Sequence, residues 1–207
     1  MRFRFTPLIL AAVAWPGFGQ SVPTTVEIYV NSRDDSAQLL GPGTPMASGI
    51  FKKIGVRLNW HRGEAPLGQN AISLRTVEHA PESATPEAMA ASQLNNSSGL
   101  EITVYKDRVR RFLDGHRSLA RVALGYVLAH ELAHVMQGLA RHSEGGILKA
   151  HWSDRDFTDM VFHKLAFSAP DVELIHKGLA LRPASGRPQP AIPVEDGNPA
   201  APSLGKR

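Results

Sequence analysis

Three ionisable side chains, His130, Glu131 and His134, lie within five consecutive positions of an otherwise apolar segment. Residues four apart lie on one face of a helix, so the two imidazoles can occupy adjacent coordination positions of a tetrahedral zinc ion. Glu131 lies too far round the helix to be a natural co-ligand, but its carboxylate can reach a water molecule on the metal. Zinc lowers the pKa of that water toward about 7, and Glu131 can then act as general base for attack on a peptide carbonyl.

A bland alternative is a pair of core histidines satisfied by hydrogen bonds. Three ionisable groups in the middle of an apolar helix cost free energy unless each has an interaction partner. A bound metal ion would supply one for all three groups. A catalytic zinc also needs a third protein ligand and an open fourth position. We prefer His142, because the chain can reverse at Gly138 and return this imidazole to the metal. The other candidates for the third ligand are Glu144, His151, Asp154 and Asp156.

The element that must carry this motif is a long helix over Leu119–Met136, with Ser118 as its N-cap and Gly138 as its stop. The helix is apolar nearly all round, which is typical of a helix buried inside a domain. Two further helices are predicted over Asp154–Phe167 and Asp171–Leu181, each opened by an acidic residue that can cap its first turn.

Upstream of the motif, alternating apolar residues predict short strands. A helix that begins at Pro45 and ends at Gly55 separates the first strand from the second. The predicted strands are 25–30, 56–60, 71–77 and 100–105. The segment 81–98, rich in Ala, Pro, Ser and Asn, is predicted to be a loop with one weak helix that could overhang a cleft.

The two ends of the chain differ from its middle in composition. Residues 1–19 are predicted to be a signal peptide, with a basic start and a short apolar run before small residues. Residues 20–182 form the predicted single domain, and 183–207, which hold six of the fifteen prolines, form a predicted disordered tail. We therefore expect a protein that is secreted or periplasmic in a bacterium, with no stable membrane span once the signal is cleaved.

Composition excludes several classes of function. The absence of cysteine excludes disulfides, thiolate ligands and a cysteine nucleophile. Residues 1–19 hold two arginines and no acid, so their removal lowers the formal net charge from +4 to +2. The sequence has no basic stripe interleaved with aromatic residues, as a nucleic-acid partner would need, and no glycine-rich loop of the kind that binds phosphate.

We also expect the protein to be a monomer.

The segment His130-Glu-Leu-Ala-His134 is the signature of the zincin metallopeptidases as it stands here, and residues 25–180 resemble that family, on its metzincin side. The run from His142 to Leu148 resembles the third-histidine and methionine-turn region of matrix-metalloprotease-like enzymes, and the chain is also similar to small exported bacterial proteins with the same motif. Two features depart from the pattern: His142 lies eight residues after His134 instead of six, and Leu148 replaces the methionine.

The resemblance implies an α+β zincin-like fold, in which a small mixed twisted sheet packs on the buried active-site helix and a short helical C-terminal subdomain follows. It also implies a zinc peptidase that acts on peptides or proteins, with Zn²⁺ on His130, His134 and His142 and with Glu131 as the catalytic residue. An exported zinc-binding or surface-interaction protein with little turnover is the alternative. An intramembrane metalloprotease is a third reading, since Val122–Ala140 is long and apolar.

Overall fold

The computed structural model describes residues 24–31, 35–66, 71–85, 88–96, 99–115 and 119–182. The predicted signal peptide and the predicted tail lie outside these residues, as does the predicted N-cap Ser118.

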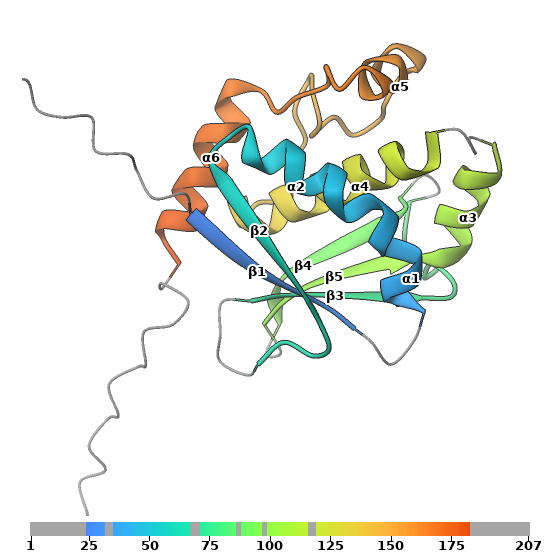
Figure 1. Ribbon diagram of the computed structural model, residues 1–207, viewed down its shortest axis with the longest axis horizontal. Helices are drawn as coiled ribbons and strands as arrows, with labels where there is room; N and C mark the ends of the chain where they lie inside the picture. Colours follow the sequence, from blue (N-terminus) through green and yellow to red (C-terminus); the bar gives the residue numbers. More distant parts are fainter. Residues whose placement is uncertain are drawn as a thin grey trace, which may run out of the picture.

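A five-stranded mixed sheet forms one layer of the protein (Figure 1). The strands run in the spatial order β2-β1-β3-β5-β4, and all neighbours are parallel except β4 and β5, which are antiparallel. Among the described strands, β4 therefore forms one edge of the sheet. The strands are β1 (Thr24–Val30), β2 (Val56–Arg62), β3 (Ile72–Val77), β4 (Ala90–Asn96) and β5 (Gly99–Tyr105).

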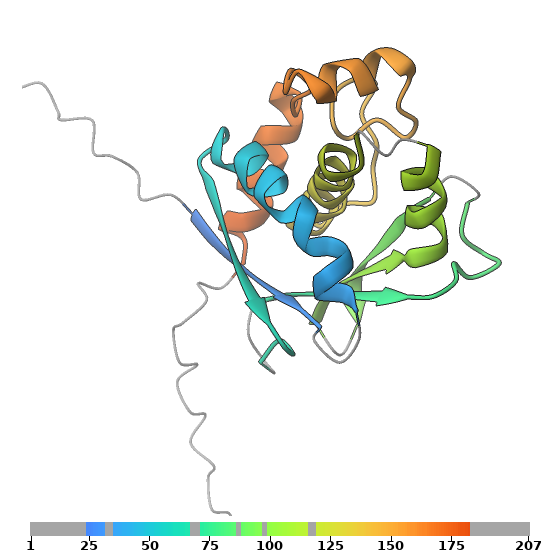
Figure 2. The ribbon, with the colours of Figure 1, turned by 45° about the vertical axis from the view of Figure 1, so that its right-hand side comes forward.

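The helices gather on one side of this sheet (Figures 1 and 2). In β1, the side chains of Val26, Ile28 and Val30 are buried on the helical side, whereas Glu27 and Tyr29 alternate with them and are half-buried. The helical elements are α1 (Ser36–Leu40), the 3₁₀ turn η1 (Gly41–Gly43), α2 (Thr44–Lys52), α3 (Lys106–Gly115), α4 (Ala120–Gln137), α5 (Asp154–Val161) and α6 (Ala169–Ala180).

Helix α4 is the centre of the packing and contacts α2, α6, η1 and β4. Two glycines permit the close helix contacts. A Cβ at Gly125 would overlap Met46 of α2, and a Cβ at Gly178 of α6 would overlap the main-chain oxygen of Met136. All but a few residues of α4 from Ala123 onward are buried, as the apolar pattern of the sequence predicts.

The predicted strands are all present, and each begins and ends within two residues of its predicted bounds. The prediction for 81–98 was wrong in one respect, because this segment contains β4. The sequence Ala-Ala-Ser-Gln-Leu-Asn-Asn has no β-branched residue and no apolar alternation, so the strand depends on main-chain pairing with β5. The helices α1 and α3 were not predicted.

Helix α5 ends at Val161, six residues before its predicted end. His163 has a positive φ of 54°, and the amide of Lys164 donates to the carbonyl of Asp159 over 2.7 Å, which closes the last turn. Beyond this turn, Leu165 and Phe167 belong to a non-helical segment, and their side chains are buried. The prediction was too long because it assigned these two apolar residues to the buried face of the helix.

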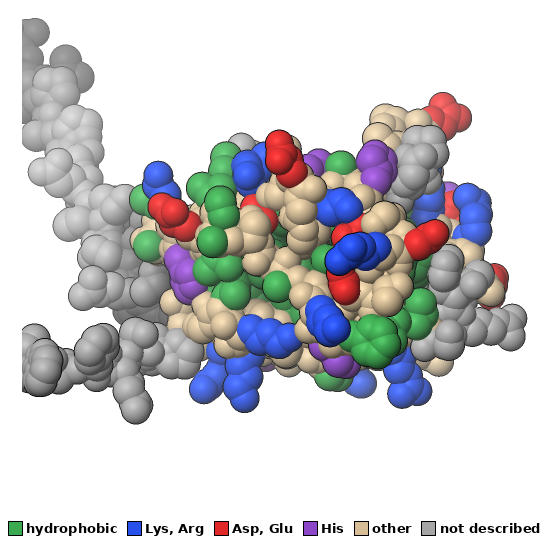
Figure 3. Space-filling view, turned by 90° about the horizontal axis from the view of Figure 1, so that it is seen from above, with side chains coloured by type: hydrophobic (Ala, Val, Ile, Leu, Met, Phe, Trp, Pro, Cys, Tyr) green, Lys and Arg blue, Asp and Glu red, His purple; other side chains and the backbone are tan. Residues whose placement is uncertain are grey.

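Both α5 and α6 begin with a capping box, with Ser153 and Ser168 as the N-caps. The acidic residue of the box is Asp171 in α6, as predicted, and Asp156 in α5, where Asp154 was predicted. The described helices include none that is long and apolar enough to cross a membrane. On the helical side of the molecule, basic and acidic side chains are interspersed with hydrophobic ones (Figure 3).

Candidate metal centre

Helix α4 presents the motif near its C-terminal end, where it passes the edge strand β4. The helix ends at Gly138, whose φ of 67° is left-handed and whose amide donates to the carbonyls of His134 and Val135. A left-handed glycine is a common helix stop, because it has no Cβ to clash. The chain then turns back alongside the helix and brings the residues after Gly138 toward His130 and His134.

The two helical histidines are oriented by main-chain carbonyls. His130 Nδ1 lies 2.8 Å from the oxygen of Ile147, and His134 Nδ1 lies 3.1 Å from the oxygen of Leu139. A carbonyl only accepts, so each Nδ1 carries a proton. The Nε2 atoms of the two rings lie 3.0 Å apart, close to the separation of about 3.3 Å between two nitrogens on one tetrahedral zinc ion.

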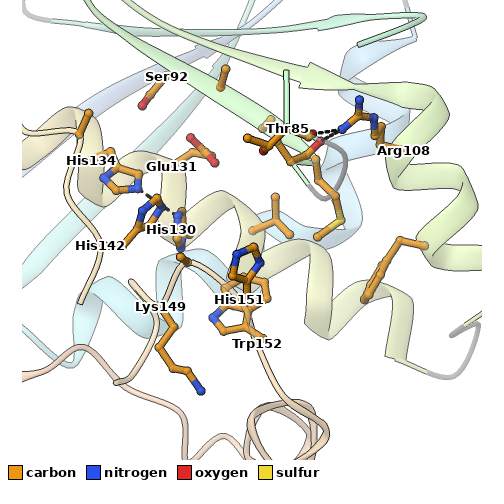
Figure 4. A pocket seen from close by; sticks show the side chains of 18 of the residues that line it. Thr85, Ser92, Arg108, His130, Glu131, His134, His142, Lys149, His151 and Trp152 are labelled. Atoms are coloured by element: carbon orange, nitrogen blue, oxygen red, sulfur yellow. Dashed lines mark hydrogen bonds between the residues drawn. The ribbon is translucent and has the colours of Figure 1, made fainter. Parts of the chain in front are cut away.

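His142 completes a cluster of three imidazoles. Its ring centroid lies 5.3 Å from that of His130 and 5.0 Å from that of His134. One nitrogen from each of the three residues can be chosen so that all lie within 4.8 Å of one another. Figure 4 shows the three rings turned toward one another beside Glu131.

The other candidates for a third ligand are not part of this cluster. Asp156 is buried in the capping box of α5 and forms an ion pair with Lys149 over 2.5 Å. Asp154 and Glu144 are exposed, and His151 lines the neighbouring pocket. Among the described residues, this group of His130, His134 and His142 is the one with metal-binding spacing.

A tight turn at Gly146 and Ile147 holds His130 in place. Gly146 has a φ of 76°, and the amide of the next residue, Ile147, donates to the carbonyl of Ala166 over 3.0 Å. The carbonyl of Ile147 accepts from His130 and also from Trp152 Nε1, over 3.2 Å. Ile147 and Leu148 are fully buried, so the turn is anchored in the core.

Glu131 lies beside the histidines, and its carboxyl points toward the side on which Ser92 of β4 lies (Figure 4). Burial raises the pKa of Glu131 to about 7, although the nearby side chain of Ser92 on β4 acts in the opposite direction. Burial also lowers the pKa of His130 to about 4, helped by the nearby His134, and burial lowers the pKa of His134. At neutral pH the two helical imidazoles are therefore uncharged and able to act as ligands.

The cluster opens into a pocket of about 750 Å³. Part of its wall is apolar and aromatic, and strand β4 contributes Ala90, Ala91 and Ser92. Arg108 is also in the wall, but its guanidinium donates to the main-chain oxygens of Thr85 and Ala88. The apolar and aromatic lining residues include Met89, Phe112, Val127, Trp152 and Phe157.

Three residues of this region were not predicted as parts of the site: Ser92, Trp152 in the wall of the pocket, and Asp171, which contacts the segment around His142. Ser92 lies on the strand that was not predicted. Asp171 was predicted only as a residue that caps the first turn of its helix. No local signal connects Asp171 with Ser143, 28 residues earlier.

No family model matches the chain, and no curated protein matches it. Among solved structures, archaemetzincin from Methanopyrus kandleri is similar at 14% identity, with a TM-score of 0.46 over 79% of this chain and 99% of that one. The GM1-bound form of the ECX AB5 holotoxin is similar at 12% identity, with a TM-score of 0.45 over 75% of this chain and 80% of that one.

Proposed function

We propose that the protein is an exported zinc-dependent peptidase that holds zinc with His130, His134 and His142 and uses Glu131 as general base. The observation that carries the proposal is the orientation of the two helical imidazoles. Each donates its Nδ1 proton to a carbonyl, so the lone pairs of both Nε2 atoms are directed at one region, 3.0 Å apart.

Two neutral imidazoles in this arrangement repel each other, because neither Nε2 has a proton to share. Satisfied core histidines would instead place a donor opposite an acceptor. A cation between the rings removes the repulsion, and the ring of His142 adds a third nitrogen donor on the same side. Carbonyl acceptors behind ligating histidines are a common feature of protein metal sites, since they set the tautomer and the ring orientation.

The donor set favours zinc over calcium or magnesium, which prefer oxygen ligands. Three protein ligands beside an open pocket are typical of a catalytic zinc site, whereas structural sites have four. When bound, zinc supplies Lewis acidity, which lowers the pKa of a water molecule at the open position and polarises a substrate carbonyl.

Glu131 is suited to the proton transfer in such a hydrolysis. A carboxylate beside the cluster can accept the proton of an attacking water and then donate it to the leaving amine. In the metal-free protein, burial already holds the pKa of this carboxyl near 7. Ser92, on the edge strand, lies on the side of the helix toward which this carboxyl points and favours its charged form. A protein that only stored or carried zinc would have no need of this residue.

The pocket supports a peptide as the substrate. Strand β4 lines it and forms the sheet edge within the described chain, and an extended peptide can add to such an edge by main-chain hydrogen bonds. The apolar and aromatic lining can take a hydrophobic side chain of that peptide. Export rests on the predicted signal peptide at residues 1–19.

The test uses the protein from residue 20 onward and its Glu131→Gln variant, with Glu144→Gln as a matched control at an exposed glutamate nearby. Zinc content is measured by mass spectrometry and cleavage with casein and a peptide library. We expect about one zinc ion per chain in all three proteins, and a loss of turnover of at least about 100-fold in Glu131→Gln alone.

Two results would contradict the proposal in different ways. Absence of zinc from the wild-type protein after loading would remove the metal site. Zinc binding without cleavage in any of the proteins would favour the alternative, an exported zinc-binding or surface-interaction protein.

A further inference from the structure

The segment that carries His142 is attached to the protein by its two neighbours. Arg141 and Ser143 both contact Asp171 at the start of α6: Arg141 Nη1 lies 3.0 Å and Ser143 Oγ 2.5 Å from Asp171 Oδ1. The segment is neither helix nor strand, and the amide of Ser143 donates to the carbonyl of Leu148 over 2.7 Å. These contacts join the end of the chain reversal to a helix that follows 28 residues later.

The carboxylate of Asp171 is fully buried, and its two oxygens have separate partners. Oδ2 accepts from Ser168 Oγ over 2.6 Å and from the Ser168 amide over 3.3 Å, as the capping box of α6 requires. Oδ1 accepts from Arg141 and Ser143. One oxygen therefore stabilises the helix end, while the other holds the residues on either side of His142.

The attachment fixes the residues on both sides of His142. Arg141 and Ser143 are held by Asp171, while the ring of His142 between them lies beside the rings of His130 and His134, with centroids 5.3 and 5.0 Å away. His142 is itself exposed, so few packing contacts restrain its ring.

We infer that Asp171 is a positioning residue for the metal site: through Arg141 and Ser143 it holds the segment that presents His142 to the metal. The inference rests on the proposed function, since it assigns Asp171 a role in zinc binding. Residues that contact a metal ligand or its segment, but not the metal, are called outer partners here. They affect metal affinity because they restrict the movement of the ligand away from the metal.

Helix α5 offers a matched control for the capping role of Asp171. It begins with the same pair, Ser153 and Asp156, and Asp156 also has one cationic partner, Lys149. Asp156→Asn therefore removes an equivalent capping carboxylate and an equivalent ion pair, and leaves Arg141 and Ser143 untouched. A difference between Asp171→Asn and Asp156→Asn reports what the carboxylate does beyond capping.

The experiment measures zinc affinity by chelator competition and the melting temperature of the metal-free protein. Asp171→Asn and Asp156→Asn should lower the melting temperature by similar amounts. Zinc affinity should fall about 10- to 100-fold in Asp171→Asn, the range observed for outer partners of metal ligands, and less than about 3-fold in Asp156→Asn.

Ser143→Ala tests the link by a second route, because it leaves the capping box of α6 intact and should fold even if Asp171→Asn does not. We expect an affinity loss of about 3- to 10-fold at an almost unchanged melting temperature, and recovery in Ser143→Thr, which keeps the hydroxyl. A purely structural role for Asp171 would leave the zinc affinity of Ser143→Ala unchanged.

Equal zinc affinity in Asp171→Asn and Asp156→Asn, or in Ser143→Ala and the wild type, overturns the inference while the proposed function stands. Failure of the wild-type protein to bind zinc overturns the proposed function and the inference together, so the two failures are distinguishable.

Discussion

The Nδ1 atom of His130 donates to the carbonyl of Ile147 over 2.8 Å and so connects the motif helix to a turn 17 residues later. The same carbonyl accepts from Trp152, whose ring lies edge-on to His130 at a centroid distance of 5.7 Å. The orientation of one candidate ligand therefore depends on the conformation of this turn, and the turn depends on the glycine that precedes Ile147.

Gly146→Ala should damage both the fold and the metal site. Gly146 has a φ of 76°, and a Cβ there would overlap the carbonyl oxygen of Ala166. We expect a loss of at least about 1–3 kcal/mol in the free energy of unfolding, together with weaker zinc binding. Gly145→Ala is the control, because no atom lies within 4 Å of its Cβ position. Equal unfolding free energies in the two variants, measured by chemical denaturation, would disprove this account of the turn.

Replacing His142 should show whether it, and not His151, is the third zinc ligand. His142→Gln is expected to weaken zinc binding by more than the roughly 100-fold upper range for an outer partner, because a ligand itself is lost. His151→Gln changes an exposed histidine of the same pocket that lies outside the cluster, and its zinc affinity should stay within about 3-fold of the wild type. Chelator competition measures both constants, and a larger loss in His151→Gln would reverse the assignment.

The raised pKa of Glu131 predicts how the stability of the metal-free protein depends on pH. Its folded pKa of about 7 lies above the ordinary value of 4.5. Well below pH 4.5 the carboxyl is neutral in both states, so ionisation adds no cost to its burial. As the pH rises from 4.5 to 7, the unfolded state ionises first and the wild-type protein loses stability.

Glu131→Gln cannot ionise and should be free of this cost. Its advantage over the wild-type protein in unfolding free energy should grow by about 1–3 kcal/mol between pH 4.5 and pH 8. Other titrating groups, including His130, are present in both proteins and cancel in the difference. Urea denaturation across this pH range, with a chelator present, measures it. A constant difference would show that the carboxyl is not buried as described.

Gly178→Ala should test the packing of α4 on α6. A Cβ at this position would overlap the main-chain oxygen of Met136 and lie 3.0 Å from the Cα of Gln137. We expect a loss of about 1–3 kcal/mol from this overpacking. Gly49→Ala, in the exposed part of α2 with no atom within 4 Å, should instead gain up to about 1 kcal/mol from helix propensity. Thermal denaturation of the two variants should therefore shift in opposite directions.

Much of the framework of this protein could be predicted from local sequence patterns. The helix around His130, its stop at Gly138 and four of the strands depend on periodicity and on turn residues within a few positions of one another. Strand β4 could not be predicted in this way. Its residues lack a strand pattern, and its main-chain hydrogen bonds go to β5, a partner that no local window identifies.

The same distinction applies to the candidate site. The pair His130 and His134, with Glu131 beside them, is determined by the sequence alone, because residues four apart in a helix share a face wherever that helix lies. The choice of His142 over Asp156 for the third place in the cluster was decided by the tertiary structure. It depends on contacts between residues far apart in the sequence. Asp171 holds the segment of His142, whereas the carboxylate of Asp156 already accepts hydrogen bonds from Lys149 and Ser153. The export signal at residues 1–19 stays a prediction.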